Sequence, residues 1–155
     1  MPLLLWLSGI SFAQKFGYVN TDYILGKMPE YQKAQSEIQT LAAAWQEEIQ
    51  QMYKGIEASY ANLKAEEVLL TREMKEERLT EIRRKEDDVK EYHNKVFGVG
   101  GLYFLKKKEL VKPVQEKVFE AVDKVARANR LSMVFDKAGD LVMIYTDPVH
   151  DYTDF

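Results

Sequence analysis

The sequence predicts an α+β fold in which a small β-containing body carries a long antiparallel helical hairpin. Strong helix formers dominate residues 30–97, which contain one glycine and no proline. Segments with the composition of β-strands lie on both sides of this stretch, at 15–20 and 132–145. Because a lone strand or hairpin is marginal in water, the long helix must fold back and bring these segments together.

The spacing of apolar residues predicts where the hairpin turns. An eleven-residue repeat runs through Leu41, Trp45, Ile49, Met52, Ile56, Tyr60 and Leu63. Beyond the apolar residues 68–70, Leu79, Ile82, Val89 and Val96 follow a seven-residue repeat. The change of period indicates two helices with a tip near residues 66–71, where Thr71 can cap the second helix.

The flanking segments complete the predicted domain. An apolar run at 3–7, followed by Ser11 and Ala13 before Gln14, is typical of a signal peptide over residues 1–13, although a buried cytosolic N-terminus is the alternative. We expect one domain at 14–155, with the body at 14–29 and about 102–155 and the helical arm at about 30–101. Asn20 can cap a short helix, and strands at 132–136 and 141–145 are expected to form a β-hairpin.

The charge pattern argues against nucleic acid as a partner. The chain has a net charge of −3 and a pI of about 5.5, so it has no overall basic field. Residues 30–95 contain eleven basic and fifteen acidic residues, whereas 106–130 contain eight basic and four acidic ones. The absence of cysteine excludes disulfides and thiolate metal sites.

We find no residue pattern that predicts catalysis or a cofactor. The two histidines, His93 and His150, are too few for a credible Ser/His/Asp arrangement. A carboxylate and histidine cluster at 147–154 could hold a metal, but it is more typical of a polar tail or helix cap, so no metal is expected. Gly98, Gly100 and Gly101 lack the lysine of a phosphate loop and are expected to form a hinge in the returning arm.

Several segments together resemble the Skp/OmpH family of periplasmic chaperones. They are Phe-Gly-Tyr-Val-Asn-Thr-Asp-Tyr-Ile-Leu from Phe16, Glu-Leu-Val-Lys-Pro-Val-Gln-Glu-Lys-Val from Glu109 (similar to Bacteroidetes-type members), and Met-Val-Phe-Asp-Lys-Ala-Gly-Asp-Leu from Met133. The resemblance implies a jellyfish-shaped homotrimer in the periplasm, whose arms enclose a cavity for unfolded outer-membrane proteins without using ATP. It leaves open a peripheral contact with the membrane surface.

Two functions fit these residues. In the first, the arm binds unfolded outer-membrane proteins through adaptable apolar and basic side chains, and the candidates are Trp45, Met52, Tyr53, Tyr60, Arg72, Lys75 and Arg78. For the apolar members the alternative is the seam between the two helices, and for the basic members it is pairing with nearby glutamates. In the second function, a structural coiled-coil adaptor of the envelope binds a folded partner through the arm tips.

Overall fold

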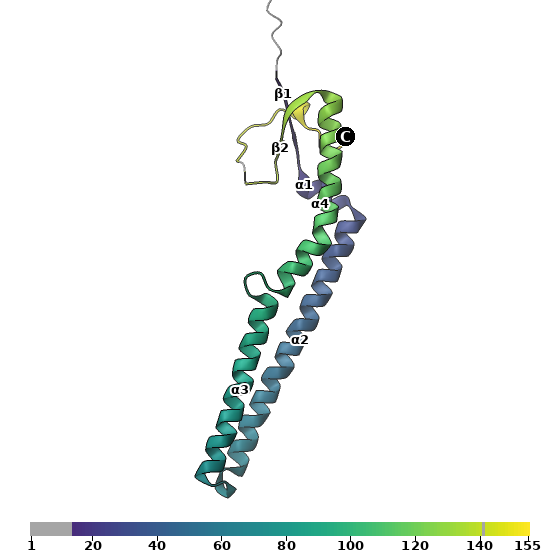
Figure 1. Ribbon diagram of the computed structural model, residues 1–155. Coiled ribbons are helices and arrows are strands. Elements are labelled where there is room, and N and C mark those ends of the chain that lie inside the picture. The colour runs from purple at the N-terminus through teal and green to yellow at the C-terminus, as the bar shows by residue number, and fades with distance from the viewer. Residues whose placement is uncertain (1–13, 141) are drawn as a thin grey trace, which may run out of the picture. The chain divides into compact units, whose positions relative to one another are not determined.

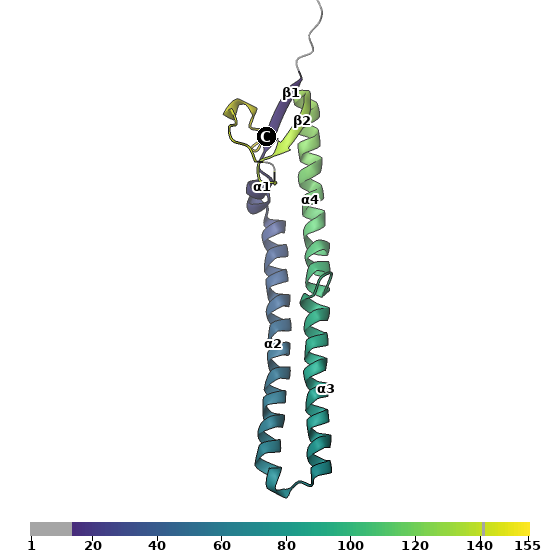
Figure 2. The same ribbon diagram turned by 90° about the vertical axis from the view of Figure 1, so that its left-hand side faces the viewer.

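The computed structural model describes residues 14–140 and 142–155, and it separates them into two compact units (Figures 1 and 2). The arm unit is Pro29–Val114. The body unit combines residues 14–28 with residues 115–155. The predicted signal peptide at 1–13 lies outside the described residues. The long helical hairpin and the small sheet confirm the predicted α+β class.

The arm unit is an antiparallel pair of long helices. Helix α2 (Pro29–Glu66) begins at a proline, which the first position of a helix tolerates well. A 3₁₀ turn, η1 (Glu67–Leu69), reverses the chain, and α3 (Arg72–Phe97) returns beside α2 in both views (Figures 1 and 2). The Thr71 hydroxyl accepts a hydrogen bond from the Met74 N–H and caps α3. Both the position of the tip and the capping residue are therefore confirmed.

The seam of the hairpin is narrow and apolar. Its buried side chains are Ile49 and Ile56 from α2 and Ile82 and Val89 from α3. Partly buried residues pack against them: Met52, Leu63, Tyr92 and Phe97. These residues belong to the two predicted repeats or adjoin them, so the periodicity identified the packed face of each helix.

Two tyrosine–carboxylate hydrogen bonds join the helices on the rim of this seam. The Tyr60 hydroxyl of α2 donates to Glu86 Oε1 of α3 over 3.0 Å, and the Tyr92 hydroxyl of α3 donates to Glu48 of α2. These hydrogen bonds raise the pKa of both tyrosines, because a carboxylate acceptor favours the protonated phenol. Each helix therefore supplies one donor and one acceptor.

Helix α4 (Leu102–Asn129) follows α3 after a short turn, and its first half belongs to the arm unit. Its second half belongs to the body unit, together with β1 (Lys15–Val19), α1 (Thr21–Lys27), β2 (Leu131–Asp136) and η2 (Pro148–His150). The Asn20 side chain accepts a hydrogen bond from the Tyr23 N–H and caps α1, as predicted. The buried residues of the body unit include Tyr18, Val19, Leu25 and Val118.

The predicted β-hairpin at 132–145 is wrong. Strand β2 pairs in parallel with β1, with Gly17 opposite Val134, and residues 142–145 form no strand; Leu141 lies outside the described residues. The other edge of β1 is occupied near the C-terminus, where the Tyr152 N–H donates to the Tyr18 carbonyl over 2.9 Å. Because β1 has partners on both sides, the sheet forms without a second strand of the hairpin.

Asp136 connects the end of β2 to the start of α1. Its carboxylate accepts hydrogen bonds from the Thr21 N–H and hydroxyl, at 3.1 and 2.5 Å, and from the Ala138 N–H at 3.0 Å. Partial burial of the Asp136 carboxyl opposes its ionisation, but these donors outweigh that effect and lower the pKa of Asp136 below the ordinary value. The ionised carboxylate therefore ties together segments that are distant in the sequence.

Candidate surfaces for client binding

The four apolar residues predicted to bind clients differ in their exposure. Trp45 is half-buried, with its ring edge-on to Phe97 at a centroid distance of 6.4 Å, and Met52 packs against the seam. Tyr53 and Tyr60 are 49% and 42% exposed. The two tyrosines thus present aromatic surface to solvent, whereas Trp45 and Met52 contribute to the packing of the arm unit. Client contact by any of the four remains a prediction.

The basic residues near the tip are paired with glutamates. Arg72 pairs with Glu76 at 3.3 Å, Lys75 with Glu67 at 3.4 Å, and Arg78 with Glu66 at 3.7 Å. Exposed pairs of this kind contribute little to stability, but they neutralise the local charge. The tip therefore lacks a concentrated positive field, and binding of clients by these three residues remains a prediction.

The most exposed side chains at the tip are apolar and were not singled out from the sequence. Val68 is 94% exposed and Leu69 is 83% exposed, because both lie on the 3₁₀ turn, where neither helix covers them. Their neighbour Leu70 is half-buried. In sequence, an exposed apolar run at a helix reversal looks the same as a buried core segment. The position of the 3₁₀ turn in the structure shows that these residues are exposed.

The glycines between α3 and α4 have specific backbone roles. Gly100 has a φ of 72°, in the left-handed region that favours glycine. A Cβ at Gly98 would lie 2.2 Å from the Asn94 carbonyl oxygen, and one at Gly101 would lie 2.6 Å from that of Val96. Residues 98–101, here the elbow turn, therefore form a tight turn of defined geometry. Its movement as a hinge remains a prediction.

We expect Gly98→Ala to destabilise the arm unit by about 1–3 kcal/mol, because the added methyl forces the backbone apart. Gly55 is the matched control, since it lies inside α2 and a Cβ there meets nothing within 4 Å. Gly55→Ala should stabilise the helix by about 0.5–1 kcal/mol. Urea unfolding followed by circular dichroism measures both changes; equal effects of the two substitutions would contradict the close approach at Gly98.

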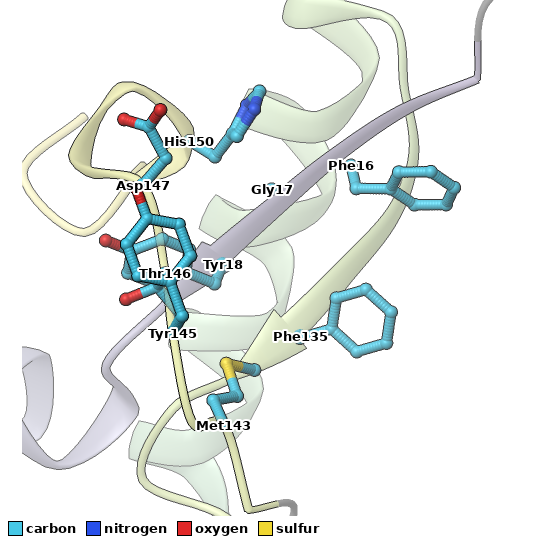
Figure 3. A pocket seen from close by; sticks show the side chains of 9 residues that line it. All are labelled: Phe16, Gly17, Tyr18, Phe135, Met143, Tyr145, Thr146, Asp147 and His150. Carbon is cyan, nitrogen blue, oxygen red and sulfur yellow. The ribbon is translucent and has the colours of Figure 1, made fainter.

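The body unit has an open apolar cavity on one side of its sheet (Figure 3). The cavity measures about 480 Å³, and its lining residues come from β1, the end of β2 and the segment after it: Phe16, Gly17, Tyr18, Phe135, Met143, Tyr145, Thr146, Asp147 and His150. The rings of Phe16 and Phe135 lie 6.4 Å apart on the sheet. Nearby, Val142 and Ile144 are 85% and 98% exposed. This face thus presents a large unpartnered apolar surface.

The carboxylates near the C-terminus act as local caps. Asp147 accepts from the Val149 N–H and caps η2, and Asp151 accepts from the N–H and hydroxyl of Thr153. Within residues 14–140 and 142–155, no group of three or more possible metal ligands comes together. None of the helices in this part of the chain is both long and apolar enough to cross a membrane.

Comparison with known proteins agrees with this architecture. The model of the family "Outer membrane protein (OmpH-like)" matches residues 15–155. A solved structure from Caulobacter crescentus CB15, described as a candidate outer membrane chaperone (OmpH-like), superposes with a TM-score of 0.74. The two sequences are 13% identical, and the superposition covers 92% of this chain and 80% of the Caulobacter chain. No curated protein matches. The family model matches the chain from the start of β1 to Phe155, a range that includes both the helical hairpin and the small sheet. The chain therefore belongs to the OmpH-like family.

Proposed function

We propose that this protein is an ATP-independent chaperone that holds unfolded outer-membrane proteins in the periplasm. The observation that carries the proposal is the arm unit of an OmpH-like chain, whose seam is narrow and whose flanks expose apolar and aromatic side chains. Many weak contacts of this kind suit a client without fixed structure, because their combined effect does not depend on a single shape.

The body unit supports the further proposal that three copies associate. Its open cavity and the exposed residues Val142, Ile144 and Tyr145 form an apolar surface that no other described part of the body unit covers. Large exposed apolar surfaces of this kind mark sites of association. Association through this surface would place several arm units around one client. Analytical ultracentrifugation of residues 14–155 should detect a trimer at micromolar concentration, and a monomer there would contradict the association.

The decisive experiment is suppression of aggregation. Several unrelated outer-membrane proteins, unfolded in urea, are diluted into buffer with and without this protein and without nucleotide, and light scattering is recorded. We expect each client to remain soluble at about one trimer per client. Aggregation of every client at the control rate would overturn the proposal.

A second function, as an envelope adaptor that binds a folded partner, is favoured by one observation. Val68 and Leu69 form a small exposed apolar surface at the arm tip. Suppression of aggregation by the unchanged protein separates the two functions, and a Val68→Ser/Leu69→Ser variant tests whether the tip contributes to it. For a chaperone that binds along its arms, the variant should suppress aggregation as well as the unchanged protein does, whereas an adaptor should protect none of the unrelated clients in either form.

A further inference from the structure

The elbow turn and the start of α4 combine exposed apolar side chains with unpaired positive charge. Val99 is fully exposed, and Phe104 and Leu105 are 51% and 56% exposed. Lys107 and Lys108 follow in the next turn of α4, and neither forms an ion pair with any residue that the structure describes. We define the elbow patch as Val99, Phe104, Leu105, Lys107 and Lys108.

The elbow patch is held in place by its surroundings. The Gly98 N–H donates to the Asn94 carbonyl over 2.8 Å, and the Gly101 N–H donates to the Gly98 carbonyl over 2.9 Å. Behind the patch, the Tyr103 ring packs against the rings of Phe97 and Phe104, with centroid distances of 6.0 and 5.5 Å. Figure 1 shows the turn as a short loop between the end of α3 and the start of α4. Surface held in this way loses little conformational entropy when it binds.

The charge of the elbow patch contrasts with that of the rest of the arm unit. Residues 30–95 carry a net charge of −4, whereas residues 98–108 contain three lysines and no acid. The first turn of α4 has no acidic residue, so nothing there offsets the partial positive charge of the helix N-terminus. Lys106 is paired with Glu109, which leaves Lys107 and Lys108 to interact with a partner.

The tip of the arm provides the internal comparison. Val68 and Leu69 are at least as exposed as Phe104 and Leu105, but the lysine and arginines around them are already paired with glutamates. At the elbow patch, by contrast, the apolar surface adjoins two lysines, Lys107 and Lys108, that form no ion pair with any described residue. Its chemistry therefore fits an extended segment that carries both apolar and carboxylate side chains.

We propose that the elbow patch is the main contact of the arm unit for clients, and that it selects unfolded segments in which apolar and acidic residues alternate. This inference rests on the proposed chaperone function. Val99, Phe104 and Leu105 contact the apolar side chains, while Lys107 and Lys108 attract the carboxylates. The acidic remainder of the arm unit repels the same carboxylates, which directs such segments to the elbow patch.

The test compares three double variants of the full chain in binding to one fluorescently labelled, urea-unfolded, acidic outer-membrane protein. Val99→Ser/Phe104→Ser removes apolar surface from the elbow patch, and Lys107→Glu/Lys108→Glu reverses its charge. Val68→Ser/Leu69→Ser at the tip is the matched control. We expect each elbow variant to weaken binding about tenfold and the tip variant to change it less than about twofold. Circular dichroism and ultracentrifugation confirm that each variant is folded and assembled.

Two labelled peptides test the charge preference directly. Both alternate aromatic residues with a charged residue, aspartate in one peptide and lysine in the other. The aspartate peptide should bind about tenfold more tightly at low salt, and the difference should shrink as ionic strength rises. Lys107→Glu/Lys108→Glu should remove the preference, and equal binding of the two peptides to the unchanged protein would overturn the inference.

The outcomes distinguish failure of this inference from failure of the proposed function. If the unchanged protein binds no unfolded client, the chaperone function itself is wrong. If it binds clients and the elbow variants bind as well as the tip variant does, only the inference is wrong. Binding to phosphatidylglycerol vesicles is measured for the same variants. Elbow variants that lose vesicle binding but keep client binding would show that the elbow patch recognises lipid, and this result would also overturn the inference.

Discussion

Val89→Asp is expected to unfold the arm unit at a much lower urea concentration than the unchanged protein requires. Val89 is 1% exposed and lies in the seam with Ile49, Ile56 and Ile82. An aspartate there must either bury its charge without a partner or open the seam, which costs about 3–5 kcal/mol. Because the seam has only one row of buried side chains from each helix, neighbouring layers offer little compensation.

The matched control for this substitution is Arg84→Asp. Arg84 lies on the same helix and is exposed, so its replacement should change the free energy of unfolding by less than about 0.5 kcal/mol. Urea unfolding followed by far-UV circular dichroism reports mainly on the arm unit, because this unit contains α2, α3 and the first half of α4 and therefore most of the helical residues. A Val89→Asp variant as stable as Arg84→Asp would show that the hairpin does not depend on this seam.

Asp136→Ala is expected to loosen the body unit by about 2–3 kcal/mol, because hydrogen bonds to a charged acceptor are lost and the Thr21 donors are left without their partner. Hydrogen exchange measured by mass spectrometry should show faster exchange in β1, α1 and β2, with little change in α2 and α3. Asp140→Ala is the control, since Asp140 is exposed and lies after the strand.

The effect of Asp136 should depend on pH in a defined direction. The folded pKa of Asp136 is lowered, so its stabilising contribution is fully present above the ordinary aspartate pKa near 4 and is lost as pH falls through the folded value. The unchanged protein and Asp136→Ala should therefore differ at neutral pH and converge in acid. A difference that persists unchanged at low pH would contradict the role of the ionised carboxylate.

The helical hairpin could be predicted from the sequence because its signals are local. Helix formers without breakers define the two helices, and the change from an eleven- to a seven-residue repeat places the reversal that the structure shows at Glu67–Leu69. Thr71 and Asn20 were also identifiable, since a capping side chain bonds to an N–H within its own turn.

The sheet was harder to predict because strand pairing depends on distant residues. Residues 142–145 are rich in the β-branched and aromatic side chains typical of a strand, yet β1 obtains its partners from β2 and from the segment at Tyr152. The solvent exposure of individual aromatic side chains could not be predicted from the sequence either. Trp45 and Phe104 are both aromatic residues on helices, but Trp45 packs edge-on to Phe97 whereas Phe104 is half exposed beside the elbow turn.

The reciprocal tyrosine–glutamate bonds have a consequence for how the hairpin can deform. Sliding α2 along α3 by one helical turn, about 5.4 Å, would break both the Tyr60–Glu86 and the Tyr92–Glu48 bonds and would also misalign the seam. Bending of the two helices together keeps these contacts. Changes in the shape of the hairpin should therefore occur by joint bending, with its two helices moving as one elastic rod, and not by shear between them.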